Sequence, residues 1–459
     1  MQRDVTATGA GRKSGATKST NSHGARRTSG KTASRQPQGP LTDPGQTQPG
    51  TVPARPRTTS RAADRDGRHA PIRGPHPELE GYRTEFPILQ RKVYLNSCSL
   101  GPLSYRSMQA LARYQELWNE HGAQAWYRIW MGELAAMREK FARLIGAQPH
   151  EVALAPNVST AVGEIASGLD FSRRNRVVLS EMDFPTLAYG WLARRREGLD
   201  VRFVPTPDHM TLPADAFAKH IDERTALVAT SRVFYLSGYI QDVRALAEMA
   251  HRKGAYFLLD DYQGTGQVPI DVKALGVDFL VTGTLKWLMG GSGLALMYVR
   301  EDLIPTLQPT LTGWFGARDQ FQFRTTEFAY RDDAARLEAG TPAVAPIYTA
   351  SAAIDIVHEV GLPRIRERTR FLADDLIRRA QAKGWPVRSP LDGNQRSSIV
   401  MLGLERPEEI VPALTERNII VDFRPGLLRI SPHFYNTVGE NETIIAAIEE
   451  ILRGREKRG

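Results

Sequence analysis

The 459-residue sequence predicts an α/β fold built on a parallel or mostly parallel sheet. Six short apolar runs have the length of buried strands. Helical patterns, such as the amphipathic stretch Asp242–Gly254, separate several of them. Apolar strands that alternate with helices are typical of a sheet covered by helices on both faces. The six runs are Arg176–Met182, Val201–Pro205, Ala226–Val233, Ala255–Asp261, Asp278–Gly283 and Gly293–Val299.

The basic charge of the chain belongs to its N-terminal segment. Residues 1–76 hold 14 lysine and arginine residues against four acidic ones, whereas the whole chain has a net charge of only +9. The segment is rich in Ser, Thr, Gly, Pro and Arg and has no aromatic residue. It cannot bury enough apolar area to offset the entropy cost of ordering. We therefore expect residues 1–80 to form a disordered basic tail.

Several functions are compatible with such a tail. Its charge would allow binding to nucleic acid or to an anionic surface. Its Arg- and Ser-rich, acid-poor composition is also typical of transit peptides, although the many Pro and Gly residues argue against the amphipathic helix that such peptides form. We favour a solvated extension or an upstream mis-assigned start, and expect no nucleic-acid partner.

Composition also limits the compartment and the metal chemistry. No run of 18 or more apolar residues occurs, so no contact with a membrane is expected. The N-terminus lacks the apolar core of a secretory signal. Cys98 is the single cysteine, which excludes a disulfide framework and a multi-cysteine metal cluster, so no metal site is predicted. We therefore expect a cytoplasmic protein.

Two globular domains are expected after the tail. The larger one, residues 81–342, starts with a short strand and a turn, continues with a long amphipathic stretch from about Tyr105 to Leu144, and contains the predicted sheet. From Ala343 the pattern changes to a long helix, short strands and a closing helix from Glu440. Residues 343–459 are therefore expected to form a smaller α+β domain.

Polar residues at strand ends are candidate site residues, because ligands of open α/β sheets bind beyond the carboxyl ends of strands. Asp260 and Asp261 end one apolar run, and Gln263 follows them. A carboxylate there is costly unless a partner pairs with it. Lys286 follows the end of another run, and the segment 157–160 opens a helix with hydroxyls and free N–H groups, which form an anion site.

These features fit one chemistry. A lysine in an apolar pocket loses its proton readily and can form a Schiff base. A carboxylate can pair with a pyridinium nitrogen, and a helix N-terminus can hold a phosphate. Each feature alone has an ordinary structural explanation, as a turn residue or a helix cap. Their joint order along the chain indicates a site for pyridoxal 5′-phosphate (PLP).

From about Tyr94 to Leu452 the sequence resembles the class V aminotransferase family of fold-type I PLP enzymes, which includes cysteine desulfurases, kynureninases and isopenicillin-N epimerases. "LLDDYQGTGQVPIDVKALGVDF" is similar to the family's VDGAQ segment, and "GTLKWLMGGSG" to its lysine segment. The resemblance implies a fold-type I PLP-dependent transferase with a mostly parallel seven-stranded sheet. It also implies PLP as cofactor, an amino-acid substrate and a homodimer with shared active sites.

The resemblance assigns a cofactor role to each matching position. Lys286 would form the Schiff base, Asp260 would hold the pyridinium nitrogen as the second catalytic residue, and Gln263 would contact the phenolic oxygen. The other residues implied by the resemblance are Ser159 and Thr160 for the phosphate, Phe184 of "SEMDFPT" for stacking on the ring, and Thr341 of "LEAGTP" for the phosphate of the neighbouring subunit.

The resemblance also implies substrate contacts. Arg429 of "LLRISPHFYNT" would clamp the substrate carboxylate. Asn96 and Ser99, in the turn "NSCSLGPLS", would line the substrate pocket. Cys98 lies in the same turn, and whether it reaches the active site is left open, since small buried cysteines are common.

The sequence departs from its relatives in ways that bear on the reaction. Desulfurases need a catalytic cysteine before the C-terminal arginine, and Cys98 lies near the start, which argues against desulfuration. Leu285 stands where kynureninases have tyrosine and desulfurases histidine, so Thr282 or Thr284 would replace that phosphate contact. Kynureninases also have histidine at the position of Gln263.

These departures leave the reaction open. We expect an enzyme acting at Cα or Cβ of an α-amino acid, with lyase or epimerase chemistry favoured over true transamination. A non-catalytic scaffold or sensor is the alternative.

Overall fold

The computed structural model describes residues 74–456, with side chains to Arg455. Most of the predicted tail lies outside these residues. The expected tail boundary at residue 80 comes too late, because Pro77–Glu85 forms a 3₁₀ helix in which Leu79 is fully buried. A buried leucine anchors a segment that composition alone assigns to the tail.

The main sheet has seven strands, as predicted, in the order β2-β8-β7-β6-β5-β3-β4. Six strands run in the same direction and β8 runs antiparallel between β2 and β7. The apolar runs form these strands because they can be buried on both faces. The strands are β2 (Val152–Ala155), β3 (Arg176–Ser180), β4 (Asp200–Val204), β5 (Thr225–Ser231), β6 (Tyr256–Asp260), β7 (Phe279–Gly283) and β8 (Ala295–Val299).

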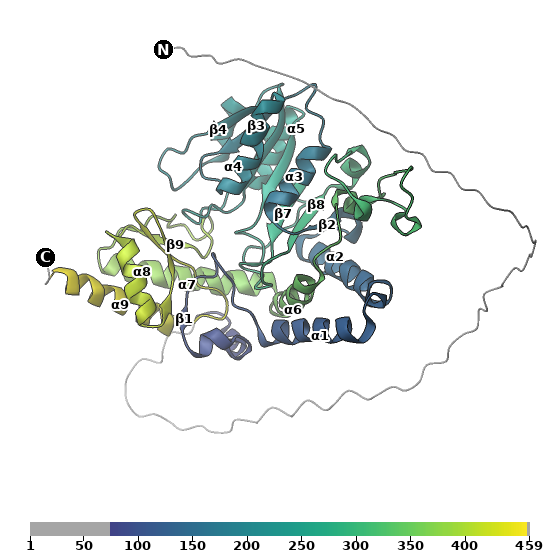
Figure 1. Cartoon of the computed structure of the whole chain (residues 1–459). Helices are drawn as coiled ribbons and strands as arrows, with labels where there is room; N and C mark the ends of the chain where they lie inside the picture. The colour runs from purple at the N-terminus through teal and green to yellow at the C-terminus, as the bar shows by residue number, and fades with distance from the viewer. Residues whose placement is uncertain (1–73, 457–459) are drawn as a thin grey trace, which may run out of the picture. The chain divides into compact units, whose positions relative to one another are not determined.

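Helices cover the sheet and alternate with its strands (Figure 1). α3 (Val158–Gly168) and α5 (Val243–Arg252) begin at Asn157 and Asp242, whose side chains accept hydrogen bonds from Thr160 N and Ala245 N. Such N-caps satisfy the free N–H groups of a first helical turn. α4 (Pro185–Leu192) starts with proline, a residue well suited to that position. Two separate hydrophobic clusters contain alternating residues of these strands, as expected for a sheet packed on both faces.

The predicted long amphipathic stretch forms two helices. α1 (Tyr105–His121) ends at Gly122, which has a φ of 51°, and a π-helical turn at Trp126–Trp130 leads into α2 (Met131–Ile145). A positive φ is easily adopted by glycine and ends the helix.

The predicted long helix after Ala343 is also broken, into α6 (Val344–Val360) and α7 (Leu362–Ala382). Gly361 between them has a φ of 84°, and proline follows at the second position of α7. Helix α6 packs against α1 and α2.

The C-terminal region forms its own sheet and core. β9 (Val400–Leu402), β11 (Asp422–Arg424) and β12 (Leu427–Ile430) make an antiparallel sheet, and β1 (Val93–Tyr94) pairs with β10 (Ile419–Ile420). α8 (Pro407–Glu416) and α9 (Val438–Glu456) complete this region, in which a third hydrophobic cluster is buried. The 3₁₀ helices are Pro77–Glu85, Pro87–Gln90, Pro149–Glu151, Ala193–Glu197, Ala214–His220, Glu301–Thr306, Trp314–Gly316, Gln320–Gln322 and Ala334–Leu337.

None of the helices between residues 74 and 456 combines the length and the apolar character needed to cross a membrane.

Candidate active site

The predicted residues meet where parallel strands end. β6 and β7 are neighbours, and the carboxyl ends of β2, β5, β6 and β7 point to the same edge of the sheet. Asp260 is the last residue of β6, and Lys286 lies three residues beyond β7. This edge is where open α/β sheets bind ligands. The topology therefore brings the two predicted catalytic residues together.

Lys286 has no ion pair among the described residues. Its ammonium nitrogen instead lies 4.2 Å from the ring centre of Tyr262 and 5.4 Å from that of Phe184. Burial lowers the pKa of Lys286 to about 8, although the nearby charge of Asp260 acts in the opposite direction. At this pKa a larger fraction of the lysine amine is neutral, and the neutral amine can act as a nucleophile or a base.

A tight turn holds the backbone of Lys286. Met289 N donates to Lys286 O at 3.0 Å, and Met289 has a φ of 56°, which is uncommon for a residue with a side chain. Gly101 lies against the same carbonyl so closely that a Cβ atom there would be 2.0 Å from Lys286 O. The turn at Gly101 therefore requires glycine and fixes Lys286 from the other side.

Asp260 is buried, with 5% exposure, and forms no salt bridge with another residue that the structure describes. In the described part of the chain its carboxylate accepts one hydrogen bond, from Tyr262 N at 3.0 Å. Burial raises the pKa of Asp260 to about 6, while this hydrogen bond and Lys286 act to lower it. The ionised form of a carboxylate buried in this way is stabilised by a cationic partner, such as a protonated ring nitrogen.

Gln263 lies in the same cavity, but both of its amide atoms already have partners. Trp287 Nε1 donates to Gln263 Oε1 at 2.8 Å, and Gln263 Nε2 donates to Cys98 O at 3.0 Å. Gln263 therefore joins the lysine turn to the turn at residues 96–101. An additional bond to the phenolic oxygen of a cofactor would have to use the remaining N–H.

Phe184 lines the same cavity as Tyr262, and both rings lie near the Lys286 amine. It precedes α4, is 40% exposed and meets the Tyr235 ring edge-on at 5.2 Å. An exposed aromatic ring facing Lys286 is available to stack on a planar ligand. The cavity is lined by Phe184, Ser231, Val233, Tyr235, Asp260, Tyr262, Gln263 and Lys286.

The predicted phosphate residues form the first turn of α3. Thr160 N and Oγ1 both bond to Asn157 Oδ1, at 2.9 and 3.1 Å. Ser159 is exposed and its hydroxyl has no partner among the described residues. An N-terminal turn with a free hydroxyl is suited to an anion. Ser159 and Thr160 do not line the Lys286 cavity itself.

Leu285 stands where the relatives have a polar residue, and Thr282 or Thr284 was expected to make the phosphate contact instead. Both threonine hydroxyls already have hydrogen-bond partners in the chain. Thr284 Oγ1 donates to Gly291 O at 2.9 Å, and Thr282 Oγ1 lies 3.4 Å from Asp261 O. Both residues are buried. Their hydroxyls therefore stabilise the turn around Lys286, and an additional role at a phosphate would compete with these bonds.

Thr341 lies outside the Lys286 cavity. It is exposed, accepts a hydrogen bond from Trp314 Nε1 at 3.2 Å, and lines a second cavity together with Thr160 and Glu164. Burial raises the pKa of Glu164 to about 8. An exposed position away from Lys286 of the same chain is compatible with a contact to a neighbouring subunit.

Arg429 is fully buried next to Tyr235, whose carbonyl accepts a hydrogen bond from Arg429 Nη1 at 3.3 Å, and it already has an acidic partner. Arg429 Nη2 donates to Asp422 Oδ2 at 2.7 Å and to Ser99 Oγ at 2.6 Å. Ser99 in turn donates to Asp422 at 2.8 Å. The predicted carboxylate clamp is therefore already paired with a partly exposed aspartate, and Ser99 belongs to the same cluster. Asn96 is half-buried, and its side chain meets only Cys98 Sγ, at 4.0 Å, among the described residues.

Four residues at the site escape the sequence reasoning: Tyr235, Tyr262, Asp422 and Arg424. Tyr262 directly follows the aspartates and could have been noticed as a bulky residue where the related segment has alanine. Asp422 could have been found from the hairpin, because a two-residue Pro-Gly turn in "VDFRPGLLRI" places it opposite Arg429. Tyr235 has no comparable signal, since only the fold brings it to Phe184.

The residues present fit the requirements of PLP. A lysine without an ion pair, a buried carboxylate with a single hydrogen bond, an aromatic face and an open helix N-terminus supply partners for the carbonyl, ring nitrogen, ring and phosphate of such a cofactor. In the described part of the chain, no group of three or more His, Cys, Asp or Glu side chains could hold a metal ion. Together the fold and the site define a fold-type I PLP-dependent enzyme.

Comparisons with known proteins agree with this class. The sequence model of the class V aminotransferase family matches residues 102–435. The chain is 36% identical over 372 residues to the uncharacterized aminotransferase YcbU of Bacillus subtilis (strain 168), covering 81% of this chain and 97% of that protein. It is also 31% identical over 393 residues to the kynureninase of Deinococcus radiodurans, covering 81% and 93%. The chain therefore belongs to the class V aminotransferase family, whose cofactor is PLP.

Solved structures confirm the predicted fold. The apo cysteine desulfurase of Thermococcus onnurineus NA1 superposes with a TM-score of 0.75 at 23% identity, covering 82% of this chain and 98% of that one. The cystine C-S lyase C-DES in complex with cysteine persulfide gives 0.73 at 22% identity, covering 79% and 98%. At this level of identity the likeness concerns the fold alone.

Proposed function

We propose that this chain acts at Cα or Cβ of an α-amino acid through Lys286. The observation that carries the proposal is the environment of this lysine. Its amine has a pKa lowered to about 8 and lies near two aromatic rings and a buried carboxylate, at the carboxyl edge of a parallel sheet. Bound PLP supplies an electron-accepting ring that makes a proton at Cα removable.

The residues of the chain then have distinct tasks. Asp260 would hold a proton at the ring nitrogen, which its single hydrogen bond leaves it free to do. Lys286 would take and return the proton at Cα, since a base with a pKa near the working pH is the most effective. Phe184 would cover one face of the ring, and the arginine cluster around Arg429 would receive the carboxylate of the substrate.

Within this activity we favour lyase or epimerase chemistry over true transamination. Cys98 is buried in the turn next to Lys286 and not in a loop before Arg429, which argues against a persulfide-forming desulfurase. Kynureninase-type cleavage is the second candidate, supported by the relatives of that name. Gln263 and Leu285 depart from the residues expected for it.

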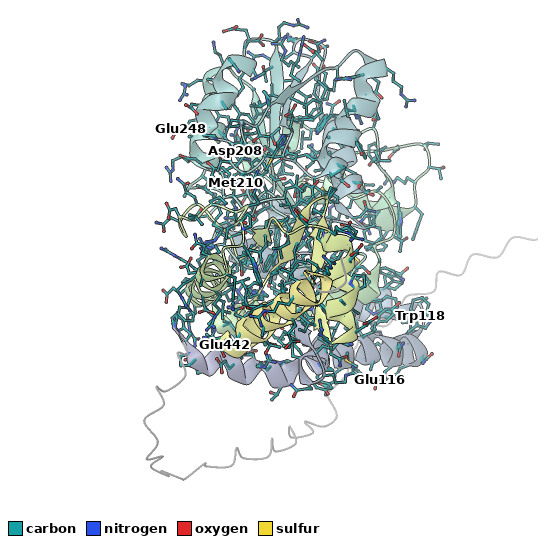
Figure 2. All side chains as sticks on the ribbon, turned by 90° about the vertical axis from the view of Figure 1, so that its left-hand side faces the viewer. Glu116, Trp118, Asp208, Met210, Glu248 and Glu442 are labelled. Carbon is teal, nitrogen blue, oxygen red and sulfur yellow. The ribbon has the colours of Figure 1, made fainter. Side chains whose placement is uncertain are left out.

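We further propose a homodimer in which Thr341 serves the site of the partner chain. Exposed apolar residues support an interface: Trp118, labelled on α1 in Figure 2, is 54% exposed, and Tyr105 and Met108 of the same helix are 48% and 49% exposed. Apolar groups gathered on a surface commonly mark interaction sites. The cytoplasmic location of the protein stays a prediction.

The first test of the proposal is the absorbance of the purified protein. The wild type should show the visible band of a lysine-bound cofactor, and Lys286→Ala should lack it while keeping its melting temperature. Lys253→Ala is the matched control, because the Lys253 side chain is 43% exposed and pairs with the exposed Glu223, away from the Lys286 cavity. A wild type without the band after incubation with PLP would refute the proposal.

A panel of amino acids then distinguishes the reactions. Pyruvate or sulfide release would indicate a lyase, anthranilate release from kynurenine the kynureninase type, and loss of Cα deuterium without other product an epimerase. Formation of a keto acid together with an aminated cofactor would instead support transamination.

Mixing two variants tests whether the sites are shared. In a hybrid of Lys286→Ala and Thr341→Val chains, one site has both native residues only if Thr341 acts across the interface. The mixture should then recover cofactor affinity that Thr341→Val alone lacks. Absence of recovery in a hybrid dimer would place Thr341 in its own chain's site.

A further inference from the structure

A second cavity, separate from that of Lys286, contains a buried carboxyl group without a partner. The cavity has a volume of about 230 Å³ and is lined by Thr160 and Glu164, which lie one helical turn apart on α3. Glu164 is 2% exposed, and neither of its carboxyl oxygens has a hydrogen-bond partner among residues 74–456. A buried polar group in this state costs free energy unless another molecule supplies the missing bonds.

A second carboxyl group, that of Glu338, lines the same cavity. Glu338 Oε1 accepts hydrogen bonds from Arg138 Nη2 at 2.6 Å and from Leu154 N at 3.0 Å, whereas Oε2 accepts none in the described part of the chain. Burial raises the pKa of Glu164 to about 8, and the charge of Glu338 acts in the same direction. Glu164 is therefore mostly protonated at neutral pH.

The charges around this cavity match a ligand with one positive charge. Arg138 neutralises Glu338, and no basic side chain among the described residues lines the cavity. The ionised form of Glu164 therefore has no positive charge to pair with in its own cavity. A cation that binds beside Glu164 would favour the ionised form and supply that charge.

The remaining lining indicates what kind of cation fits. Besides the two carboxyl groups and the hydroxyls of Thr160 and Thr341, the cavity wall is aliphatic, with side chains such as Leu294 and Ile347. A hard metal cation needs a shell of about six oxygen ligands, which this wall does not offer. A primary ammonium group has three N–H donors for carboxyl oxygens, and its carbon chain packs against apolar side chains. The small volume favours a short chain.

We infer that the cavity at Glu164 and Glu338 binds a primary ammonium group carried on a short aliphatic chain. Glu164 is the main partner of the ammonium group, and Glu338 Oε2 is the second. Such a group occurs in small free amines and at the end of a lysine side chain. Thr341 of the cavity wall is exposed, so either a free amine or a lysine of a partner chain has access. The inference does not depend on the reaction at Lys286.

The test is a thermal-shift titration with n-butylammonium chloride at constant ionic strength. The wild type should show a saturable rise in melting temperature. Glu164→Gln should bind the amine at least about tenfold more weakly, because glutamine copies the shape of the protonated side chain but cannot become an anion. Tetramethylammonium, which has the charge without N–H donors, and KCl should give no saturable rise. The visible band is recorded in parallel, and a change common to both chains belongs to Lys286.

The pH dependence of binding provides a second readout. Binding of the cation displaces one proton from Glu164, so the affinity should rise about tenfold per pH unit below pH 8 and then level off. In Glu164→Gln the affinity should not depend on pH in this range. Glu139→Gln, on an exposed glutamate of α2 next to Arg138, is the matched control and should behave as the wild type.

The source of the ammonium group follows from the same variants. If a lysine of a partner chain fills the site, n-butylammonium should leave the wild type unchanged, and Glu164→Gln should raise the dissociation constant of the dimer at least about tenfold in sedimentation equilibrium. Glu164→Asp keeps the charge and should retain part of the binding in either case. A Glu164→Gln chain that equals the wild type in both measurements would overturn the inference. Saturable stabilisation by KCl instead of the amine would also overturn it.

Discussion

Asp260 and Asp261 are neighbours at the end of β6, yet their surroundings are opposite. Asp261 is completely buried and receives two bonds from Arg232, at 2.6 and 2.8 Å, and one from Thr265 at 2.6 Å. Asp260 is almost as buried and receives one bond, from a backbone N–H. Among the described residues, the carboxylate of Asp261 has partners for both oxygens, whereas that of Asp260 can accept further hydrogen bonds.

This difference separates a structural group from one available for chemistry. Arg232 also donates to the carbonyls of Val268 and Pro269, so the pair with Asp261 ties β5 to the loop after β6. Satisfied buried charges of this kind hold a fold in one arrangement. An undersatisfied buried carboxylate costs stability and persists where a ligand completes it. The partners of a residue, and not its type, therefore decide which aspartate serves the site.

The largest expected effect comes from breaking the satisfied pair. Asp261→Asn should lower the free energy of unfolding by about 3–5 kcal/mol, because it leaves the Arg232 charge buried without a partner. Thermal and urea denaturation of the apoprotein measure this change. The double variant Asp261→Asn, Arg232→Met should recover part of the loss, and no recovery would show that the pair is not the cause.

Replacement of Asp260 by asparagine should have the opposite effect, because it should lower turnover and not stability. Asp260→Asn should reduce turnover by roughly 100-fold, the size of effect seen when a preorganised electrostatic group is removed. Its stability should not fall. The pKa of Asp260 is raised from 3.8 to about 6, so an ionised Asp260 costs stability above that pH, and asparagine removes the cost. A clear drop in melting temperature at pH 7.5 would contradict the comparison.

The pH dependence of cofactor capture offers a finer test. Only the neutral amine of Lys286 can attack the cofactor, so the rate at which apoprotein takes up PLP should rise with pH around a midpoint of about 8. Asp260→Asn should move this midpoint to lower pH, because the negative charge of Asp260 favours the ammonium form. Stopped-flow absorbance measures the rate, and a midpoint that does not respond to this variant would contradict the coupling.

The smallest effects should follow from changes at Tyr262. Its ring lies 4.2 Å from the Lys286 amine, and burial raises the pKa of its hydroxyl to about 12. Tyr262→Phe keeps the ring and should leave the capture midpoint unchanged. Tyr262→Leu removes a contact between cation and ring worth about 0.5–1 kcal/mol and should lower the midpoint by less than one pH unit. An equal shift of the capture midpoint in both variants would assign the role to the hydroxyl.

Much of the fold could be predicted because apolar runs that must be buried on both faces have few other solutions. The strands from β3 to β8 lie at or within two residues of the predicted runs. The breaks at Gly122 and Gly361 were missed, since an amphipathic pattern continues across a single glycine. The burial of Leu79 was missed because the hydrophobic cluster that contains it includes residues far away in sequence, such as Phe434 and Tyr435.

The site was predictable to a different degree. The order of the strand ends brings Lys286, Asp260, Gln263 and Phe184 to one cavity. Their roles in binding PLP stay predictions. Hydrogen-bond partners could not be predicted in the same way: Thr282 and Thr284 look free in the sequence, but their hydroxyls bond to nearby carbonyls.

The sequence by itself determined which residue types stand at which strand ends, because hydrophobic periodicity and chain order fix the sheet and its active edge. Only the tertiary structure decided how each charge is compensated. Asp261 meets Arg232 across 29 residues, and Arg429 meets Ser99 across 330. The energy of a buried charge depends on atoms within a few ångströms, and those atoms come from distant segments that only the folded chain brings together.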